Sequence, residues 1–201
     1  MAMYFQNINV DDVTIGPEEF GNNGGKYRKL SYKNGQLKDV QLGAGLKDLV
    51  RCPYGIEPVA QEQPDKYCIK IDANSDLTAF VQALDAKVIE AVNDSSLTHR
   101  STLRIGTISN NMKIKILPDT TILVTTMKNE SSMTKPVTGS MQDITYNSMI
   151  LPIIKIVGGV YFINENYGTS VVASQVLVVK GVNSHTAVDF CLGDGVTMDS
   201  D

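Results

Sequence analysis

The residues of this sequence best suited to chemistry are aromatic and basic side chains that alternate along short stretches of β type. In the stretch 27–33, Tyr27, Lys29 and Lys33 fall on one side of an extended chain, and Arg28 and Tyr32 on the other. Binding of a single nucleic-acid strand needs cations that follow the phosphates and flat rings that stack on the bases. The pattern therefore indicates a surface for single-stranded nucleic acid, although lysine and tyrosine are also common on ordinary exposed strands.

Similar pairs of basic and aromatic residues recur later in the chain. Because each stacked base contributes about 1–3 kcal/mol, a few rings outweigh a modest surplus of positive charge. Phosphates are expected along Lys29, Lys33, Arg51, Lys113 and Lys115, and bases on Tyr27, Tyr32, Tyr54 or Tyr167, whereas Tyr161 is also suited to the core beside Phe162. The full predicted binding set is Tyr27, Arg28, Lys29, Tyr32, Lys33, Arg51, Tyr54, Lys113, Lys115, Lys155, Tyr161 and Tyr167.

Patterns typical of catalysis are absent from the sequence. It contains no HExxH, GxSxG or GxxxxGK[ST] motif, and neither His99 nor His185 has an evident catalytic partner. The three cysteines show no CxxC spacing, so buried reduced thiols are expected instead of a zinc site. Asp72 and Asp119, at predicted strand ends, leave a metal-dependent nuclease open as an alternative. We predict a protein that is not an enzyme and needs no cofactor or metal.

The net charge of −4 hides an uneven distribution. All 18 basic residues lie between Lys26 and Lys180, beside 14 of the 22 acids, so this segment carries a net charge of +4. Ordinary solubilising termini would explain the acids outside it, but an acidic tail that competes with an anionic ligand or recruits partners would explain them too. The predicted regulatory residues of this tail are Asp189, Phe190, Asp194, Asp199 and Asp201.

Predicted strands dominate the chain, with turn signals every 8–12 residues. The strongest is a hairpin of two apolar runs, Ile153–Ile163 and Ser170–Lys180. Within it, Gly158-Gly159 suggests a bulge or a bend of the barrel and not a phosphate loop. Residues 112–117 alternate strictly between apolar and basic, as one strand would. The one predicted helix spans about 75–93, with Ser75 as its expected N-cap. Apolar residues recur on one face of this helix at steps of three and four: Leu77, Phe80, Val81, Leu84, Val88 and Val92.

About eight short strands and one helix predict a mainly β protein, an OB-fold-like Greek-key barrel with one inserted helix and extended termini. We expect a flexible or extended N-terminal arm over residues 1–25, an OB-fold-like domain over 26–186 and an acidic C-terminal tail over 187–201. The first residues have no basic flank or apolar segment of signal-peptide length, and no apolar run is long enough to span a membrane. A location in the cytoplasm or nucleus, not secretion, is expected.

Three segments resemble the single-stranded-DNA-binding proteins of nucleocytoplasmic large DNA viruses, which are relatives of phage single-strand binders with an OB-fold. The first is the Pro-aromatic-Gly element within 51–56, and the second is the strand 67–72 followed by the helix. The third is Gly159-Val160-Tyr161-Phe162 with the strand that follows it. The resemblance spans about residues 50–180. The chain departs from the family at Val171-Val172, where relatives often place a tryptophan, and between the helix and the hairpin, where it is short.

The resemblance implies binding of single-stranded DNA during viral DNA replication, recombination or repair at the replication site in the host cytoplasm or nucleus. It implies no catalytic chemistry and no membrane contact. Partner proteins would be bound through the acidic tail, and a homodimer stays open. The alternative from another class is a non-enzymatic structural or virion protein with a β-sandwich, which would show a large apolar face and no basic groove.

Overall fold

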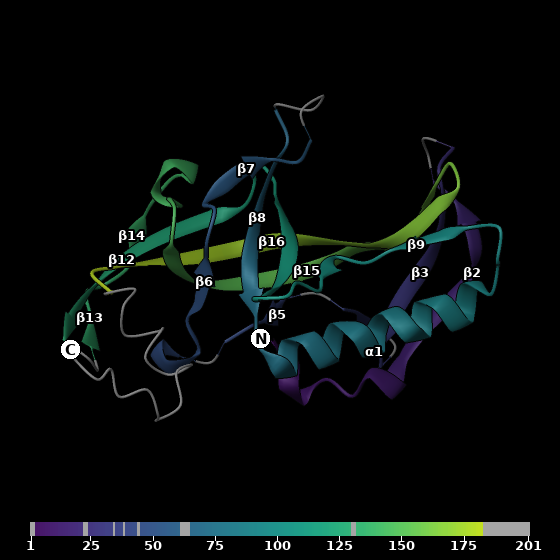
Figure 1. The fold of residues 1–201 in the computed structure, drawn as a ribbon, viewed down its shortest axis with the longest axis horizontal. Coiled ribbons are helices and arrows are strands. Elements are labelled where there is room, and N and C mark those ends of the chain that lie inside the picture. The colour runs from purple at the N-terminus through teal and green to yellow at the C-terminus, as the bar shows by residue number, and fades with distance from the viewer. Residues whose placement is uncertain are drawn as a thin grey trace, which may run out of the picture.

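The computed structural model describes residues 3–21, 24–33, 35–37, 39–43, 45–60, 65–129 and 132–182. Within these residues it confirms a mainly β protein with one α-helix, α1, Ser75–Val92 (Figure 1). The strands are β1 Met3–Tyr4, β2 Val13–Phe20, β3 Lys26–Tyr32, β4 Gly35–Gln36, β5 Val40–Gln41, β6 Val50–Cys52, β7 Ile56–Pro58, β8 Tyr67–Ala73, β9 Thr98–Arg100, β10 Leu103–Arg104, β11 Asn110–Ile116, β12 Thr121–Asn129, β13 Ser132–Met133, β14 Val137–Thr138, β15 Ser148–Ile163 and β16 Asn166–Lys180. Four 3-10 turns are η1 Phe5–Asn7, η2 Val10–Asp12, η3 Leu46–Asp48 and η4 Met141–Asp143.

The hairpin β15–β16 runs along the whole length of the molecule (Figure 1). Its turn is tighter than the sequence predicts, because Ile163 already pairs with Asn166 and only residues 164 and 165 lie between them. Asn164 has φ 53°, which asparagine tolerates better than most residues. Strand β16 pairs in parallel with β9, then β11, then β12 along its length. Strand β15 likewise pairs with β3, β5 and β6 at different points along its length.

The predicted bulge at Gly158-Gly159 is confirmed by the register of the hairpin. The pairing of β15 with β16 shifts between Ile156 and Val160, and Gly159 has φ +81°. At this point β15 also crosses β3, where Val160 pairs with Arg28. A Cβ on Gly159 would lie 2.1 Å from the carbonyl oxygen of Arg28, so only glycine lets the two backbones approach this closely.

Strands β8 and β11 form an antiparallel pair whose two faces differ sharply. Ile114 pairs with Ile69 and Met112 with Ile71, and all four are buried on the inner face. The outer face of the same pair carries the lysines of both strands. The predicted alternation of residues 112–117 is therefore confirmed, and the inner face is where α1 packs. The buried helix positions include every member of the predicted apolar stripe: Leu77, Phe80, Val81, Leu84, Val88 and Val92.

The start of α1 is capped by Asn74, one residue before the predicted cap Ser75. The Asn74 side-chain oxygen accepts a hydrogen bond of 2.9 Å from the backbone N–H of Leu77. Asparagine is as good an N-cap as serine, so local sequence preference did not distinguish the two residues. At the other end, Asn93 adopts the left-handed conformation with φ 45° and closes the helix.

Replacing Asn74 with alanine should lower the free energy of unfolding by about 1 kcal/mol, because the N–H of Leu77 loses its partner. Ser75→Ala is the matched control, since Ser75 is exposed and lies inside the helix. Its effect should stay within about 0.5 kcal/mol. Urea denaturation of the two variants measures both values, and an equal loss in the two would contradict the assignment of the cap.

The segment expected to be an N-terminal arm is extended and lies against the rest of the fold. Phe5, Ile8 and Val13 belong to the core, and β2 pairs along β3. Within this segment, the two 3-10 turns η1 and η2 precede β2. The boundary at residue 26 thus falls between two paired strands, and the division into arm, domain and tail stays a prediction. The predicted tail, 187–201, lies outside the described residues.

The short connection around Pro118-Asp119 does not fold β12 back beside β11. Strands β11 and β12 instead pair with separate parts of β16, at Lys115–Val172 and at Thr121–Gln175 onward. Both pairings are parallel, so β12 extends the sheet in the direction of β11 instead of folding back onto it.

Candidate nucleic-acid interface

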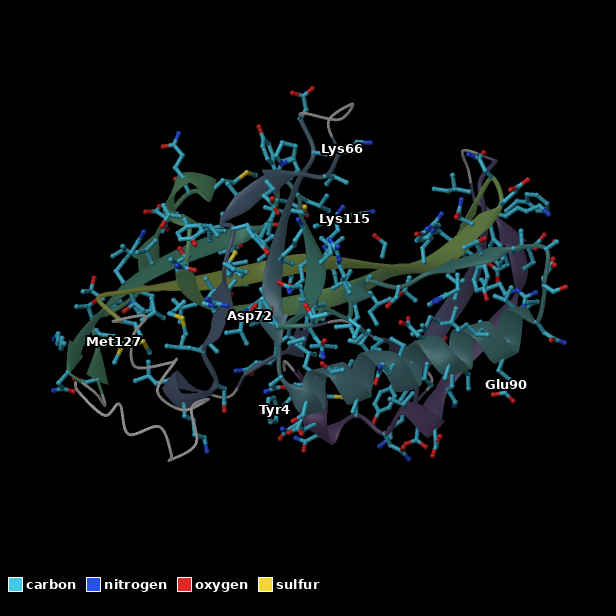
Figure 2. All side chains as sticks on the ribbon, in the orientation of Figure 1. Tyr4, Lys66, Asp72, Glu90, Lys115 and Met127 are labelled. Carbon is cyan, nitrogen blue, oxygen red and sulfur yellow. The ribbon has the colours of Figure 1, made fainter. Side chains whose placement is uncertain are left out.

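Lysines gather on the outer face of β8 and β11. Lys70 pairs directly with Lys113, and Lys115 lies two residues further along the same face of β11. Like charges directly opposite each other destabilise a sheet. A row of this kind therefore costs stability in the free protein and suits a surface that meets an anion. In Figure 2, Lys115 and Lys66 lie toward the end of the β8–β11 pair that is distant from α1.

The lysine row borders two neighbouring hollows, of about 420 Å³ and 220 Å³. They share Ser101, Thr102 and Lys113, so together they form one groove. We call this surface the basic groove. Its charged and aromatic lining residues are Tyr54, Lys70, Arg100, Arg104, Lys113, Lys115 and Tyr161. Among the described residues that line it, five are basic and none is acidic.

Several cations of the basic groove are held in position by neighbours. The Lys113 Nζ donates a hydrogen bond of 3.0 Å to the carbonyl oxygen of Val59. The Arg100 Nε donates to the Asn166 side chain at 2.6 Å. Lys70 is the least available, because its Nζ lies 2.9 Å from the Glu57 carboxylate. The groove is thus largely pre-formed, which lowers the entropy lost when a ligand binds.

The fold disfavours the charged form of Lys115. Burial lowers its pKa below the ordinary value, and the positive charges of Lys113 and Lys66 lower the pKa further. A lowered lysine pKa means that the charged form is less favourable here than in water. An anion beside Lys115 would reverse part of this effect, since an opposite charge favours the protonated amine.

Two of the predicted tyrosines open onto the basic groove. Tyr54 is 54% exposed, and the Lys70 Nζ lies 5.1 Å from the centre of its ring. Tyr161 is half-buried and lines the smaller hollow. Burial raises the pKa of Tyr161, while Arg100 opposes that shift. Its hydroxyl would lie 3.3 Å from a Cβ on Gly168, so the ring extends over the glycine of the neighbouring strand.

Two other predicted stacking residues are corrected by the structure. Tyr32 is 6% exposed and Tyr167 is 4% exposed, and both belong to the hydrophobic core. Tyr167 packs between Phe162, with ring centres 6.1 Å apart, and His99, at 5.3 Å. Neither ring presents a face to a ligand. The sequence does not show which face of a strand is buried, so it did not distinguish a buried tyrosine from an exposed one. In the fold, the side chains of Tyr32 and Tyr167 lie on the buried face.

The remaining predicted residues lie outside the two hollows, and most have local partners. Arg51 Nε lies 2.6 Å from the Asp72 carboxylate. The Tyr27 hydroxyl donates to Glu19 at 2.7 Å. Arg28 donates to the carbonyl oxygen of Ala91 at the end of α1, and Lys33 lies 3.7 Å from Asp12.

Register brings two of them close to the basic groove. Lys155 pairs with Val172, which also pairs with Lys115, so the two lysines share a row across the sheet. Tyr27 pairs with Tyr161. Lys29 is exposed on β3. The groove therefore gathers Tyr54, Lys113, Lys115 and Tyr161 from the predicted set, with Lys155 and Tyr27 in adjoining rows.

Three cations of the basic groove were missed by the sequence reasoning: Lys70, Arg100 and Arg104. A signal existed for Lys70, because it alternates with the buried Ile69 and Ile71 in the same way as Lys113 alternates with Ile114. Arg100 and Arg104 lie on strands of three and two residues, too short to show any period. Their contribution depends on the tertiary packing of the segment 98–109.

A partly buried polar cluster joins this segment to α1. His99 Nε2 is 3.5 Å from a carboxylate oxygen of Asp85 on α1, so His99 does have an acidic neighbour that the sequence did not reveal. The Ser101 hydroxyl donates to the other oxygen of Asp85. Because the serine bonds the carboxylate and not the imidazole, the cluster lacks the serine–histidine contact that activates a nucleophile. It joins α1 to β9 and so supports the position of Arg100.

The cysteines and acids form no metal-binding group in the part of the chain that the structure describes. Cys52 and Cys68 are buried free thiols, as predicted, and burial raises the pKa of Cys52 to about 11. Within the same residues, no helix combines the length and apolar character needed to cross a membrane. The predicted tail residues Asp189, Phe190, Asp194, Asp199 and Asp201 lie outside the described residues.

Comparison with known proteins finds similar solved structures, including two of one phage protein. No protein-family model and no curated protein matches the chain. The chain is similar to the single-stranded DNA-binding protein from bacteriophage Enc34, with 16% identity, a TM-score of 0.42, and coverage of 88% of this chain and 99% of the other. A C-terminal truncation of that phage protein has 15% identity, a TM-score of 0.38, and coverage of 85% and 97%. The viral family suggested by the sequence stays a prediction.

Proposed function

We propose that the basic groove binds single-stranded DNA without strong sequence preference and without catalysing a reaction. The observation that carries this proposal is the composition of the groove, in which five basic side chains and no acid line two joined hollows. Tyr54 and Tyr161 supply rings at the two hollows. Cations beside rings serve a single strand better than a duplex, because only unpaired bases expose their flat faces.

Fluorescence anisotropy with a labelled oligo-dT tests the proposal. Binding should weaken as salt rises, because lysine and arginine release counterions from the phosphates. Single-stranded DNA should compete with the labelled strand far better than a duplex of the same length, and a matched RNA strand measures the preference between the two nucleic acids. Absence of salt-sensitive binding below tens of micromolar protein would refute the proposal.

The biological setting proposed here is viral DNA replication, recombination or repair, at the replication site in the host cytoplasm or nucleus. Support comes from the resemblance of the segments within residues 50–180 to the viral single-strand binders. A protein of this kind protects or presents a strand to replication and recombination proteins, so its partners would be the strand and those proteins.

The acidic segment 189–201 is proposed to regulate the same groove. Its four aspartates would compete with phosphates for the lysines, so deletion of 189–201 should tighten binding at low salt and have little effect at high salt. Comparison of the deletion with the full chain in the anisotropy assay measures this. Equal affinities at low salt would remove the segment from the mechanism.

A further inference from the structure

A large apolar side chain stands fully exposed at the edge of the basic groove. Ile108, in the loop between β10 and β11, is 99% exposed and lines the larger hollow together with Tyr54. Ile105 in the same loop is also exposed, at 58%, but does not line the hollow. An isoleucine side chain that buries nothing in the free protein gains most from a ligand with an apolar surface.

Tyr54 has a charged neighbour, and the loop that carries Ile108 is constrained by its own hydrogen bonding. Tyr54 lies under the Lys70 ammonium group, 5.1 Å from its ring centre. The loop is tightly turned, because the N–H of Gly106 donates to the Asn110 side chain at 3.3 Å. A Cβ on Gly106 would lie 2.4 Å from the carbonyl oxygen of Ser109, so a larger residue there would open the loop.

We propose that the hollow between Tyr54 and Ile108 takes one nucleobase of the bound strand, with the tyrosine ring against one face of the base and the isoleucine against the other. This inference rests on the proposed function and adds to it a slot for a single base. Stacking of a base between an aromatic and an apolar side chain is an established way of holding an unpaired nucleotide.

The positive charge of the larger hollow favours a nucleotide over an apolar peptide as its ligand. The charged residues that line the larger hollow are Lys70, Arg104 and Lys113, all cationic. A base in the slot brings its phosphates to these cations, whereas an apolar peptide segment brings no compensating charge. The volume of about 420 Å³ lies within the range of small-ligand sites, and Thr107, Ser109 and Asn111 supply polar groups for the edge of the base.

The test compares an oligo-dT with the same strand carrying abasic nucleotides, which keep the phosphates and remove the bases. The wild-type protein should bind the abasic strand at least fivefold more weakly, since a stacked base is worth about 1–3 kcal/mol. Ile108→Ser should weaken binding of oligo-dT by about fivefold and leave binding of the abasic strand unchanged. Ile105→Ser is the matched control and should leave both unchanged.

Each outcome distinguishes the base slot from the binding function. If Ile108→Ser binds each of the two strands with the same affinity as the wild type does, the slot is refuted and the proposed function stands. The slot is also refuted if Ile105→Ser lowers affinity as much as Ile108→Ser, because that shows a general effect of the loop. If the wild type binds neither strand, the proposed function itself fails. A 2-aminopurine base in the strand reports stacking directly, by fluorescence that changes with the wild type and not with Ile108→Ser.

Discussion

Replacing Lys113 and Lys115 together with glutamine should weaken binding of oligo-dT about tenfold at low salt. Both side chains lie on the outer face of β11, and Lys113 borders both hollows of the basic groove. Removing one lysine from a phosphate should also reduce the slope of log affinity against log salt by about 0.7, so the slope of the double variant should fall by about 1.4. Anisotropy titrations at several salt concentrations give both quantities.

The control for this experiment is a double variant with the same net charge. Lys47 and Lys135 are exposed and line neither hollow, so Lys47→Gln with Lys135→Gln changes the total charge equally. Its affinity and salt slope should stay close to those of the wild type. Equal losses of affinity in the two doubles would show that overall charge, and not the basic groove, governs binding. Urea denaturation checks that Lys113→Gln, which removes the hydrogen bond to Val59, leaves the fold intact.

Gly159→Ala should lower the free energy of unfolding by roughly 3 kcal/mol or more, which is large for the addition of one methyl group. Two costs combine. The backbone has φ +81°, which alanine adopts only with strain, and the new Cβ would lie 2.1 Å from the Arg28 oxygen and 2.7 Å from the Leu30 nitrogen. Both of these atoms belong to the backbone of β3, so relief requires the two strands to separate.

Two other glycines divide this effect into its parts. Gly24 also has positive φ, +75°, but a Cβ there would meet nothing within 4 Å, so Gly24→Ala measures the conformational cost alone, about 1 kcal/mol. Gly45 has an extended backbone and open space, and Gly45→Ala should change stability little. Chemical denaturation of the three variants provides the comparison. A loss of stability at Gly159 no larger than that at Gly24 would contradict the close approach of β15 and β3.

Local sequence was sufficient to predict those features that depend on a single helix or strand. The helix stripe from Leu77 to Val92 predicted both the helix and its buried face, because a period of 3.6 leaves only one apolar side. Alternation in 112–117 predicted that Lys113 and Lys115 share a face opposite Ile114 and Ile116, which is a property of the pleat alone. Gly158-Gly159 likewise predicted a bulge, since paired glycines are unusual inside a regular strand.

Which of the candidate tyrosines are buried was decided only by tertiary structure. Tyr32 and Tyr167 are buried and Tyr54 is exposed, although all three appeared equally suited to stacking. The basic groove itself joins residues from β8, β9, β10, β11 and β15 with Tyr54, and only strand register places Lys70 opposite Lys113. The sequence by itself thus determined the elements, the helix face and the outward lysines, because these follow from periods within one segment. The groove, its arginines and its available rings depended on packing between segments far apart in the chain, which no local period encodes.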